Sequence, residues 1–255
     1  MRDRSVDLYA DDGGSGDGLP VVLLHSLAGN TAQWESQLAH LRRTRRAVAL
    51  DWRGHGRSGP APDGDWSPHA MAEDVAAAVD RLRLGRFVLV GHSAGGLVAL
   101  AYAAAHPERV AGVLLLDPAG DTRRIPAEMI DAFVDALQGD AYHATIDGYW
   151  RSIAGRDPAI RDRLLADLHA TPQATVAGIF RALREFEVEP VLNAYRGPRL
   201  AMVTPQNNGP FSLHNIDRSL PHRMVTGTGH WIQLERPDEL NRILDEFILS
   251  AESPG

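Results

Sequence analysis

The sequence predicts a single α/β domain built on a mostly parallel β-sheet that is flanked by helices. A length of 255 residues suits one such domain with an insertion. Short β-branched or leucine-rich runs alternate with helical patterns along most of the chain, which is typical of a parallel sheet. Most of the runs are apolar up to their last residue, as expected for strands that carry helices on both faces.

Six of these runs are predicted to be strands, and amphipathic helices are predicted between them. The runs are Val21–His25, Ala47–Asp51, Phe87–Gly91, Val113–Asp117, Leu200–Thr204 and Arg223–Thr226. One helix is predicted to start at Ser67 and Pro68, because serine is a favoured N-cap and proline is favoured in the first turn. The last helix is predicted to begin at Pro237, since the apolar residues after it recur at helical spacing.

One long interval breaks the alternation of strands and helices. From about Pro118 to Arg196 the sequence has no convincing strand and several short helical stretches. A separate domain is one interpretation, but the chain on both sides continues one sheet pattern. We therefore expect an α/β core of residues 1–117 and 197–255, with residues 118–196 forming a helical cap inserted between two strands.

Composition narrows the classes of function. The formal net charge is −7, and 44% hydrophobic with 23% charged residues is ordinary for a globular protein. Basic residues are not clustered enough to bind phosphates, so neither nucleic acid nor an anionic membrane surface is an expected partner. The lack of cysteine rules out disulfides, thiolate catalysis and cysteine-ligated metal sites. No signal-peptide core or membrane-spanning run is visible, and we expect a cytoplasmic protein, with the oligomeric state left open.

The motif GHSAGG places Ser93 between a predicted strand and a predicted helix. A nucleophile on such a sharp turn needs small neighbours, which Gly91, Ala94, Gly95 and Gly96 supply. The hydroxyl then projects above the sheet, and the amide of Ala94 lies at a helix N-terminus, where negative charge is favoured. Ser93 is therefore the candidate nucleophile and Ala94 a candidate oxyanion-hole residue, the alternative being a plain glycine-rich turn.

A serine hydroxyl is a poor nucleophile without a neighbouring base. His230 follows the last predicted strand and precedes the last predicted helix, so it is expected at the edge of the sheet where Ser93 also emerges. We predict that His230 is the general base. None of the 11 histidines forms a metal-binding pattern such as HExxH, and no cofactor is implied.

An oxyanion hole needs a second backbone amide, from the loop after an early strand. The motif HSLAG, which begins at His25, forms this loop in the predicted order of elements. Leu27 is the predicted donor, with Ser26 as the next candidate. His25 is predicted to brace the loop rather than to take part in chemistry.

Four motifs resemble the α/β-hydrolase fold superfamily, in particular its esterases, lactonases and carbon–carbon-bond hydrolases. They are, in order, HSLAG, DWRGHGRS at residues 51–58, GHSAGG and GTGHWIQLERPDEL at residues 227–240. The resemblance implies an eight-stranded, mostly parallel sheet with the insertion as a cap over the site. In that family the DWRGHGRS segment is a structural turn, so no catalytic role is assigned to it. A serine at position 93 argues against the dehalogenases and epoxide hydrolases of this fold, which use an aspartate.

The acid of the expected Ser–His–acid triad is the least certain member by sequence. In most members of the family the acid follows the strand predicted here at Leu200–Thr204, and the matching position is Asn207. Asparagine orients a histidine ring but does not neutralise its charge. Asp117, at the end of the strand expected beside the nucleophile strand, is the predicted substitute, and Asp217 is a second candidate. An aspartate at a strand end can also simply anchor the start of the cap.

Together these motifs predict a serine hydrolase that cleaves carboxylic esters or lactones through an acyl-enzyme. The alternatives are a cofactor-free haloperoxidase, a carbon–carbon-bond hydrolase and a weakly catalytic ligand receptor of the same fold. The substrate is expected to be a small molecule whose identity the sequence does not give. The large cap residues could line an apolar pocket or form the cap's own core; they are Phe133, Tyr142, Tyr149, Trp150, Ile179 and Phe180.

Overall fold

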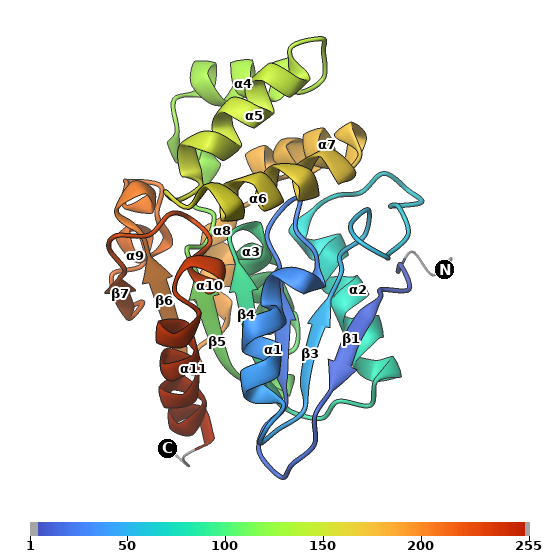
Figure 1. Cartoon of the computed structure of the whole chain (residues 1–255), viewed down its shortest axis with the longest axis vertical. Helices are drawn as coiled ribbons and strands as arrows, with labels where there is room; N and C mark the ends of the chain where they lie inside the picture. Colours follow the sequence, from blue (N-terminus) through green and yellow to red (C-terminus); the bar gives the residue numbers. More distant parts are fainter. Residues whose placement is uncertain (1–4, 253–255) are drawn as a thin grey trace.

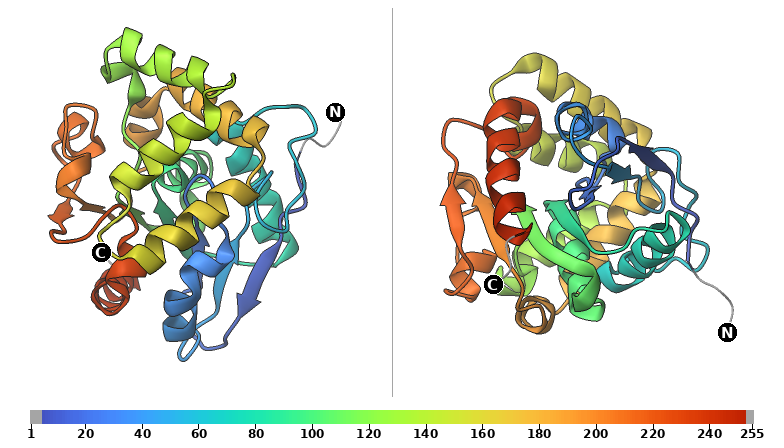
Figure 2. Two further views of the ribbon diagram at one scale, coloured as in Figure 1. Left: turned by 45° about the horizontal axis from the view of Figure 1, so that its top comes forward. Right: turned by 90° about the horizontal axis from the view of Figure 1, so that it is seen from below.

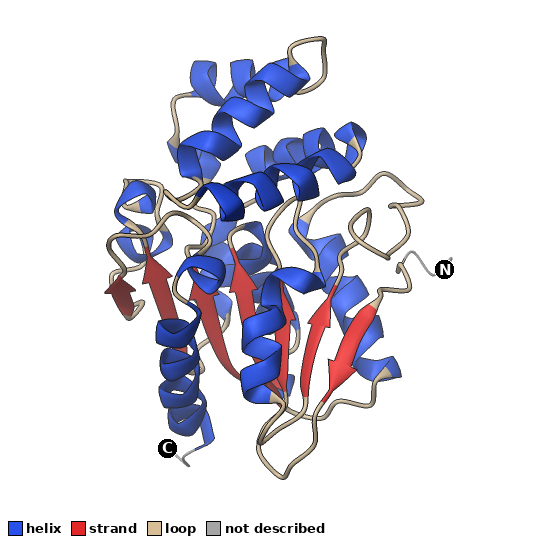
Figure 3. Ribbon diagram, viewed as in Figure 1, coloured by secondary structure: helices blue, strands red, loops and turns tan. Residues whose placement is uncertain are grey.

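The computed structural model describes residues 5–252, which form one seven-stranded sheet covered by helices. The strand order is β1-β3-β2-β4-β5-β6-β7. Only β1 runs antiparallel to its neighbour, so the carboxyl ends of the other strands all meet at the upper edge of the sheet (Figures 1 and 3). The strands are β1 (Ala10–Gly13), β2 (Val21–Leu24), β3 (Ala47–Leu50), β4 (Phe87–His92), β5 (Val110–Leu116), β6 (Arg199–Val203) and β7 (His222–Met224).

The six predicted strands are present, and the α/β class is confirmed. The sheet has seven strands rather than the eight that the family resemblance implies. A single strand, β1, precedes β2, and the described chain before β1 does not pair with the sheet as a strand. Val6 instead donates its amide to the Asp74 carboxylate over 2.6 Å, and Tyr9 accepts one hydrogen bond from the Asp51 amide. These isolated contacts hold the segment against the fold without making it a strand.

Helices form a layer on each face of the sheet (Figure 2, right). α1 and α11 cover one face, while α2, α3 and α8 cover the other. The helices are α1 (Glu35–Leu41), α2 (Pro68–Arg81), α3 (Ala94–Ala105), α4 (Ala127–Ala136), α5 (Tyr142–Ile153), α6 (Pro158–Ala170), α7 (Gln173–Glu185), α8 (Val188–Ala194), α9 (Leu213–Ile216), α10 (Ile232–Glu235) and α11 (Pro237–Glu252). The predicted start of α2 is confirmed: Ser67 is its N-cap and accepts from the Ala70 amide, with Pro68 in the first turn.

Two apolar cores lie on the two sides of the sheet, and alternate residues of each central strand serve them. In β4, Phe87 and Leu89 pack into the core under α2 and α3, whereas Val88 and Val90 pack into the core under α1 and α11. All four of these side chains are fully buried. Burial on both faces explains why the strands have continuous apolar sequences.

The insertion between β5 and β6 is helical, as predicted. Helices α4 to α7, which we call the cap, lie above the carboxyl ends of the strands (Figure 2, left). The fifth helix of the insertion, α8, packs instead against α3 in the layer beside the sheet. The division into a core of residues 1–117 and 197–255 and a cap of residues 118–196 stays a prediction.

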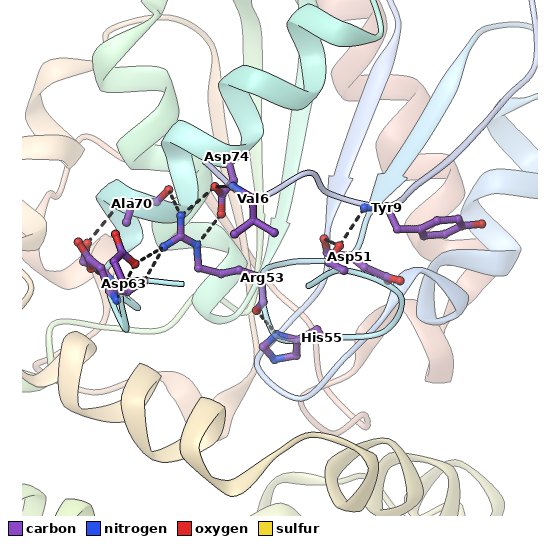
Figure 4. A network of polar contacts seen from close by, with 11 residues as sticks. Val6, Tyr9, Asp51, Arg53, His55, Asp63, Ala70 and Asp74 are labelled. Carbon is purple, nitrogen blue, oxygen red and sulfur yellow. Dashed lines mark hydrogen bonds and ion pairs between the residues drawn. The ribbon is translucent and has the colours of Figure 1, made fainter. Parts of the chain in front are cut away.

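A buried ion pair fixes the turn after β3 against α2 (Figure 4). The Arg53 and Asp74 side chains are each 1% exposed. Arg53 Nε donates to Asp74 Oδ2 over 2.5 Å and Nη2 donates to Oδ1 over 2.8 Å. Arg53 also donates to the carbonyls of Asp65 and Ala70, while Asp74 accepts from the Val6 amide. We call this set of contacts the Arg53 network.

No helix within residues 5–252 is both long enough and apolar enough to cross a membrane.

Candidate active site

Ser93 lies on a strained turn between β4 and α3. Its backbone has φ 54° and ψ −121°, a combination that residues other than glycine rarely adopt. The turn leaves no room for side chains at its glycines: a Cβ on Gly91 would lie 2.3 Å from the Gly95 carbonyl oxygen, and one on Gly95 would lie 2.4 Å from the His25 carbonyl oxygen. The geometry of the turn therefore requires small residues in GHSAGG, as predicted from the sequence.

Asp117 follows β5, the strand beside β4, and is fully buried. Both oxygens of its carboxylate accept from Thr204, which comes directly after β6. Asp117 Oδ1 accepts from the Thr204 amide over 2.7 Å, and Oδ2 accepts from the Thr204 hydroxyl over 2.9 Å. These bonds fix the direction of the carboxylate. The sequence analysis missed Thr204, because a threonine at a strand end has no distinctive pattern.

His230 lies on the loop before α10 and meets Asp117 directly. The distance from His230 Nδ1 to Asp117 Oδ2 is 2.6 Å, and the histidine side chain is 13% exposed. A protonated Nδ1 donates this hydrogen bond, which leaves the lone pair on Nε2. Ser93, Asp117 and His230 all line the same cavity. The structure thus brings together the three residues predicted from three different strand ends.

The backbone of His230 is held from two sides. Its amide donates to the carbonyl of Ile153, the last residue of α5 in the cap, over 2.9 Å. Its carbonyl accepts from His92 Nε2, also over 2.9 Å. His92 Nδ1 in turn accepts from Gln233 Nε2 over 3.0 Å. Burial lowers the pKa of His92 well below its usual value, in keeping with a neutral ring that donates at Nε2.

Leu27 and Ala94 line the same cavity as Ser93. Ala94 is the first residue of α3, and first-turn amides have no partner within their own helix. Leu27 belongs to the loop after β2, which neighbours β4 in the sheet. Ser26 also lines the cavity.

Two buried histidines hold the loop that carries Leu27. His25 Nε2 accepts from the Trp52 amide over 3.1 Å, and His55 Nε2 accepts from the Ala28 amide over 3.0 Å. The Nδ1 atoms lie 2.7 Å and 3.0 Å from the carbonyls of Ser26 and Arg53. Burial lowers the pKa of His25 to about 4 and that of His55 to about 3. Both rings are therefore neutral braces with both nitrogens engaged, as predicted for His25.

Asn207, at the position usual for the acid, and Asp217, the second candidate, are engaged elsewhere. Asn207 lines the cavity, but its side-chain amide donates to the Pro118 carbonyl over 2.7 Å. Asp217 forms an ion pair with Arg199 at 3.3 Å and accepts from Ser219. Within residues 5–252, the His230 ring makes one hydrogen bond, and its partner is Asp117.

The cavity has a volume of about 420 Å³ and lies between the strand ends and the cap. Of the six large cap residues considered from sequence, Phe133, Tyr149, Trp150 and Phe180 line it, whereas Tyr142 and Ile179 are buried outside its lining. Burial of its hydroxyl and the Asp117 carboxylate together raise the pKa of Tyr149, although 39% of the residue's surface is exposed. Among the described residues, no group of three or more histidine, aspartate or glutamate side chains is arranged to hold a metal ion.

Comparison with known proteins agrees with this architecture. The sequence profile of the alpha/beta hydrolase fold family matches residues 20–237. The chain belongs to this family.

Two curated members of wide coverage are similar to this α/β hydrolase. A putative carbamate hydrolase RutD from Variovorax paradoxus is 28% identical, over 98% of this chain and 99% of its own length. A 2-hydroxymuconate semialdehyde hydrolase from Pseudomonas sp. strain CF600 is also 28% identical, over 94% of this chain and 90% of its own length. Among solved structures, Est816, described as an N-acyl homoserine lactone degrading enzyme, superposes with a TM-score of 0.81 at 27% identity, covering 95% of this chain and 97% of Est816.

These relatives share the name of hydrolase or degrading enzyme but differ in the bond that their names imply. The coarse function of this α/β hydrolase is therefore hydrolysis of a small molecule, and the class of bond must be argued from the site.

Proposed function

We propose that this hydrolase cleaves carboxylic esters or lactones through an acyl-enzyme intermediate on Ser93. One observation carries the proposal. His230 Nδ1 lies 2.6 Å from a buried, fully oriented Asp117 carboxylate, in a cavity that also exposes Ser93 on its strained turn. This is the arrangement that a base needs in order to accept the proton of a serine hydroxyl.

In the proposed reaction, the Ser93 hydroxyl attacks the substrate carbonyl carbon while His230 Nε2 takes its proton. The developing oxyanion accepts hydrogen bonds from the amides of Ala94 and Leu27, each of which lowers the barrier by about 3 kcal/mol. His230 then protonates the leaving alkoxide. A water molecule, deprotonated by His230, releases the acid and restores Ser93.

Asp117 is the proposed acid of this triad. Its charge stabilises the imidazolium that forms during each step, and its hydrogen bond keeps the proton on Nδ1, so that the Nε2 lone pair is available to accept the Ser93 proton. Thr204 supports this role, because its amide and hydroxyl together hold the carboxylate in one orientation. The proposed assignment takes the acid from the end of β5, while Asn207 after β6 keeps a polar contact to the Pro118 carbonyl.

The proposal is tested by the turnover of p-nitrophenyl butyrate in Ser93→Ala, His230→Ala and Asp117→Asn. Each variant is expected to reduce kcat by a factor on the order of a thousand or more, because each removes one member of the triad. Asp245→Asn is the matched control: its side chain is 49% exposed on α11, and its partner is His40. Far-UV circular dichroism should show that all four variants keep the fold. Near wild-type turnover in Ser93→Ala would contradict the proposed nucleophile.

A further inference from the structure

The walls of the cavity carry almost no charge. Within the described chain, the ionisable side chains that line it are Asp117, His230 and Tyr149. Asp117 and His230 are hydrogen-bonded to each other. None of the arginines within residues 5–252 lies in this lining. A negative group bound away from the scissile bond would therefore find no cation there.

The wall on the cap side of the cavity is lined mainly by apolar side chains. Its aromatic rings pack on one another: the Phe133 ring centroid lies 5.4 Å from that of Tyr149 and 5.1 Å from that of Phe180. Rings packed edge to face in this way have well-defined positions. The apolar side chains of the wall come from the chain before α4 and from α4 and α7; they are Ile125, Met129, Ile130, Phe133, Phe180 and Leu183.

Arg123 and Arg124, which precede the wall residue Ile125, are already paired, whereas Arg181, next to Phe180, lines a different pocket with Trp66 and Glu185. Arg123 bonds to Asp121 at 2.9 Å and to Glu187 at 3.2 Å. Arg124 forms an ion pair with Glu189. To serve a substrate, either guanidinium would have to leave its carboxylate partners.

We propose that the site selects a neutral substrate whose apolar acyl group packs under α4 and α7, and that it rejects esters carrying a second, free carboxylate. This inference rests on the proposed ester or lactone hydrolysis and specifies its substrate class. An unpaired carboxylate in an apolar wall loses its hydration without compensation. Each methylene that leaves water for this wall is instead stabilised.

The first experiment compares p-nitrophenyl esters of graded length, from acetate to octanoate, with one matched pair. The pair is the mono-p-nitrophenyl ester of suberic acid and the same compound with its free carboxyl methylated. We expect kcat/KM to rise about fourfold for each methylene until the cavity is filled. We expect the free acid to react at least about a hundredfold more slowly than its methyl ester. Equal kcat/KM for the two suberates would overturn the inference.

The second experiment supplies the missing cation. Met129 lines the cavity, but 66% of its surface is exposed, so an arginine is tolerated there. In Met129→Arg we expect the ratio of kcat/KM for the free acid to that for its methyl ester to increase at least about tenfold, since the carboxylate gains a partner. Met224→Arg is the matched control, because Met224 is 42% exposed on β7 and lies outside the cavity lining. The same ratio in both variants would overturn the inference.

Failure of this inference can be distinguished from failure of the proposed function. Suppose that Ser93 forms an acyl-enzyme and esters turn over, but the free acid and its methyl ester have equal kcat/KM. The proposed substrate class is then wrong, and the hydrolytic mechanism stands. If no ester in the series is hydrolysed and Ser93 is not acylated, both are overturned.

Discussion

The Arg53 network and the Asp117–His230 pair lie at the same edge of one sheet, and each buries a carboxylate. The Asp74 carboxylate is surrounded by fixed donors: two guanidinium nitrogens of Arg53 and the Val6 amide. The Asp117 carboxylate is also surrounded by donors, from Thr204 and His230. The difference is that Asp117 and His230 line a cavity of about 420 Å³, whereas neither Arg53 nor Asp74 lines it.

The two histidines associated with these clusters show what this difference means. His55 has both ring nitrogens engaged, by the Arg53 carbonyl and the Ala28 amide, and burial lowers its pKa to about 3. His230 has Nδ1 engaged by Asp117 and lines the cavity beside Ser93. Burial and hydrogen bonding alone do not distinguish a structural group from a reactive one. A reactive group also needs an atom that faces the cavity.

Asp74→Ala should lower the stability of the fold but not the activity, which would distinguish the Arg53 network from the Asp117–His230 pair. The substitution removes the buried carboxylate partner of Arg53 and leaves the 25% exposed Asp63 carboxylate, 3.6 Å away, as its counter-ion. The free energy of unfolding is expected to fall by about 3 kcal/mol. Urea unfolding at neutral pH measures this loss. For the fraction that remains folded, kcat/KM should stay within a factor of about three of wild type. Asp74 does not line the cavity, and its hydrogen bonds go to Val6 and Arg53 rather than to the loop that carries Leu27.

Asp80→Ala is the matched control on the same helix. Its side chain is 66% exposed and pairs with Arg109 at the surface, so its loss is expected to cost less than about 1 kcal/mol. Equal losses in Asp74→Ala and Asp80→Ala would contradict the interpretation of the Arg53 network as a buried structural contact.

Acid should weaken the fold through the buried histidines. Burial holds the pKa of His25 at about 4 and that of His55 at about 3, below the ordinary histidine value. The unfolded chain therefore binds more protons below about pH 6.5, and folding stability decreases as the pH falls. From about pH 7.5 to about pH 5.5, each of these histidines should remove about 1 kcal/mol from the free energy of unfolding.

Urea unfolding at the two pH values measures this effect in wild type and in His55→Gln. The variant should lose less stability on acidification, by about 1 kcal/mol, since one proton-binding site of the unfolded chain is removed. His143→Gln, on the exposed surface of α5, should behave as wild type. An identical pH dependence in His55→Gln and wild type would show that His55 is not the neutral brace inferred here.

The fold was largely predictable because strands and helices have local patterns. Apolar runs predicted β2 to β6, the run Arg223–Thr226 overlaps the exposed edge strand β7, and Ser67 with Pro68 predicted the start of α2. β1 was missed: its sequence, ADDG, has no strand pattern, and its ladder depends on the neighbouring β3. The eighth strand expected from the family is absent from the described chain, because isolated contacts replace a ladder before β1.

The candidate site was likewise predictable only where its requirements are local in sequence. Glycine spacing around Ser93 is a local requirement and is visible in the sequence. The supports of the Asp117–His230 pair are not, because Thr204, His92 and Ile153 come from three distant segments that meet only in the folded chain. Asn207 illustrates the limit of matching positions. Replacing it with aspartate would place a carboxylate oxygen against the Pro118 carbonyl, which now accepts from its amide.

The most direct test of the account is the position of the covalent adduct formed with a fluorophosphonate. The reagent reacts with a serine that a neighbouring base has activated. Peptide mass spectrometry of the wild type should find one adduct, on Ser93, with none in Ser93→Ala and much slower labelling in Asp117→Asn. An adduct on another serine, labelling that persists in Ser93→Ala, or a wild-type protein that is not labelled would contradict the assignment of Ser93, His230 and Asp117 as one reactive unit.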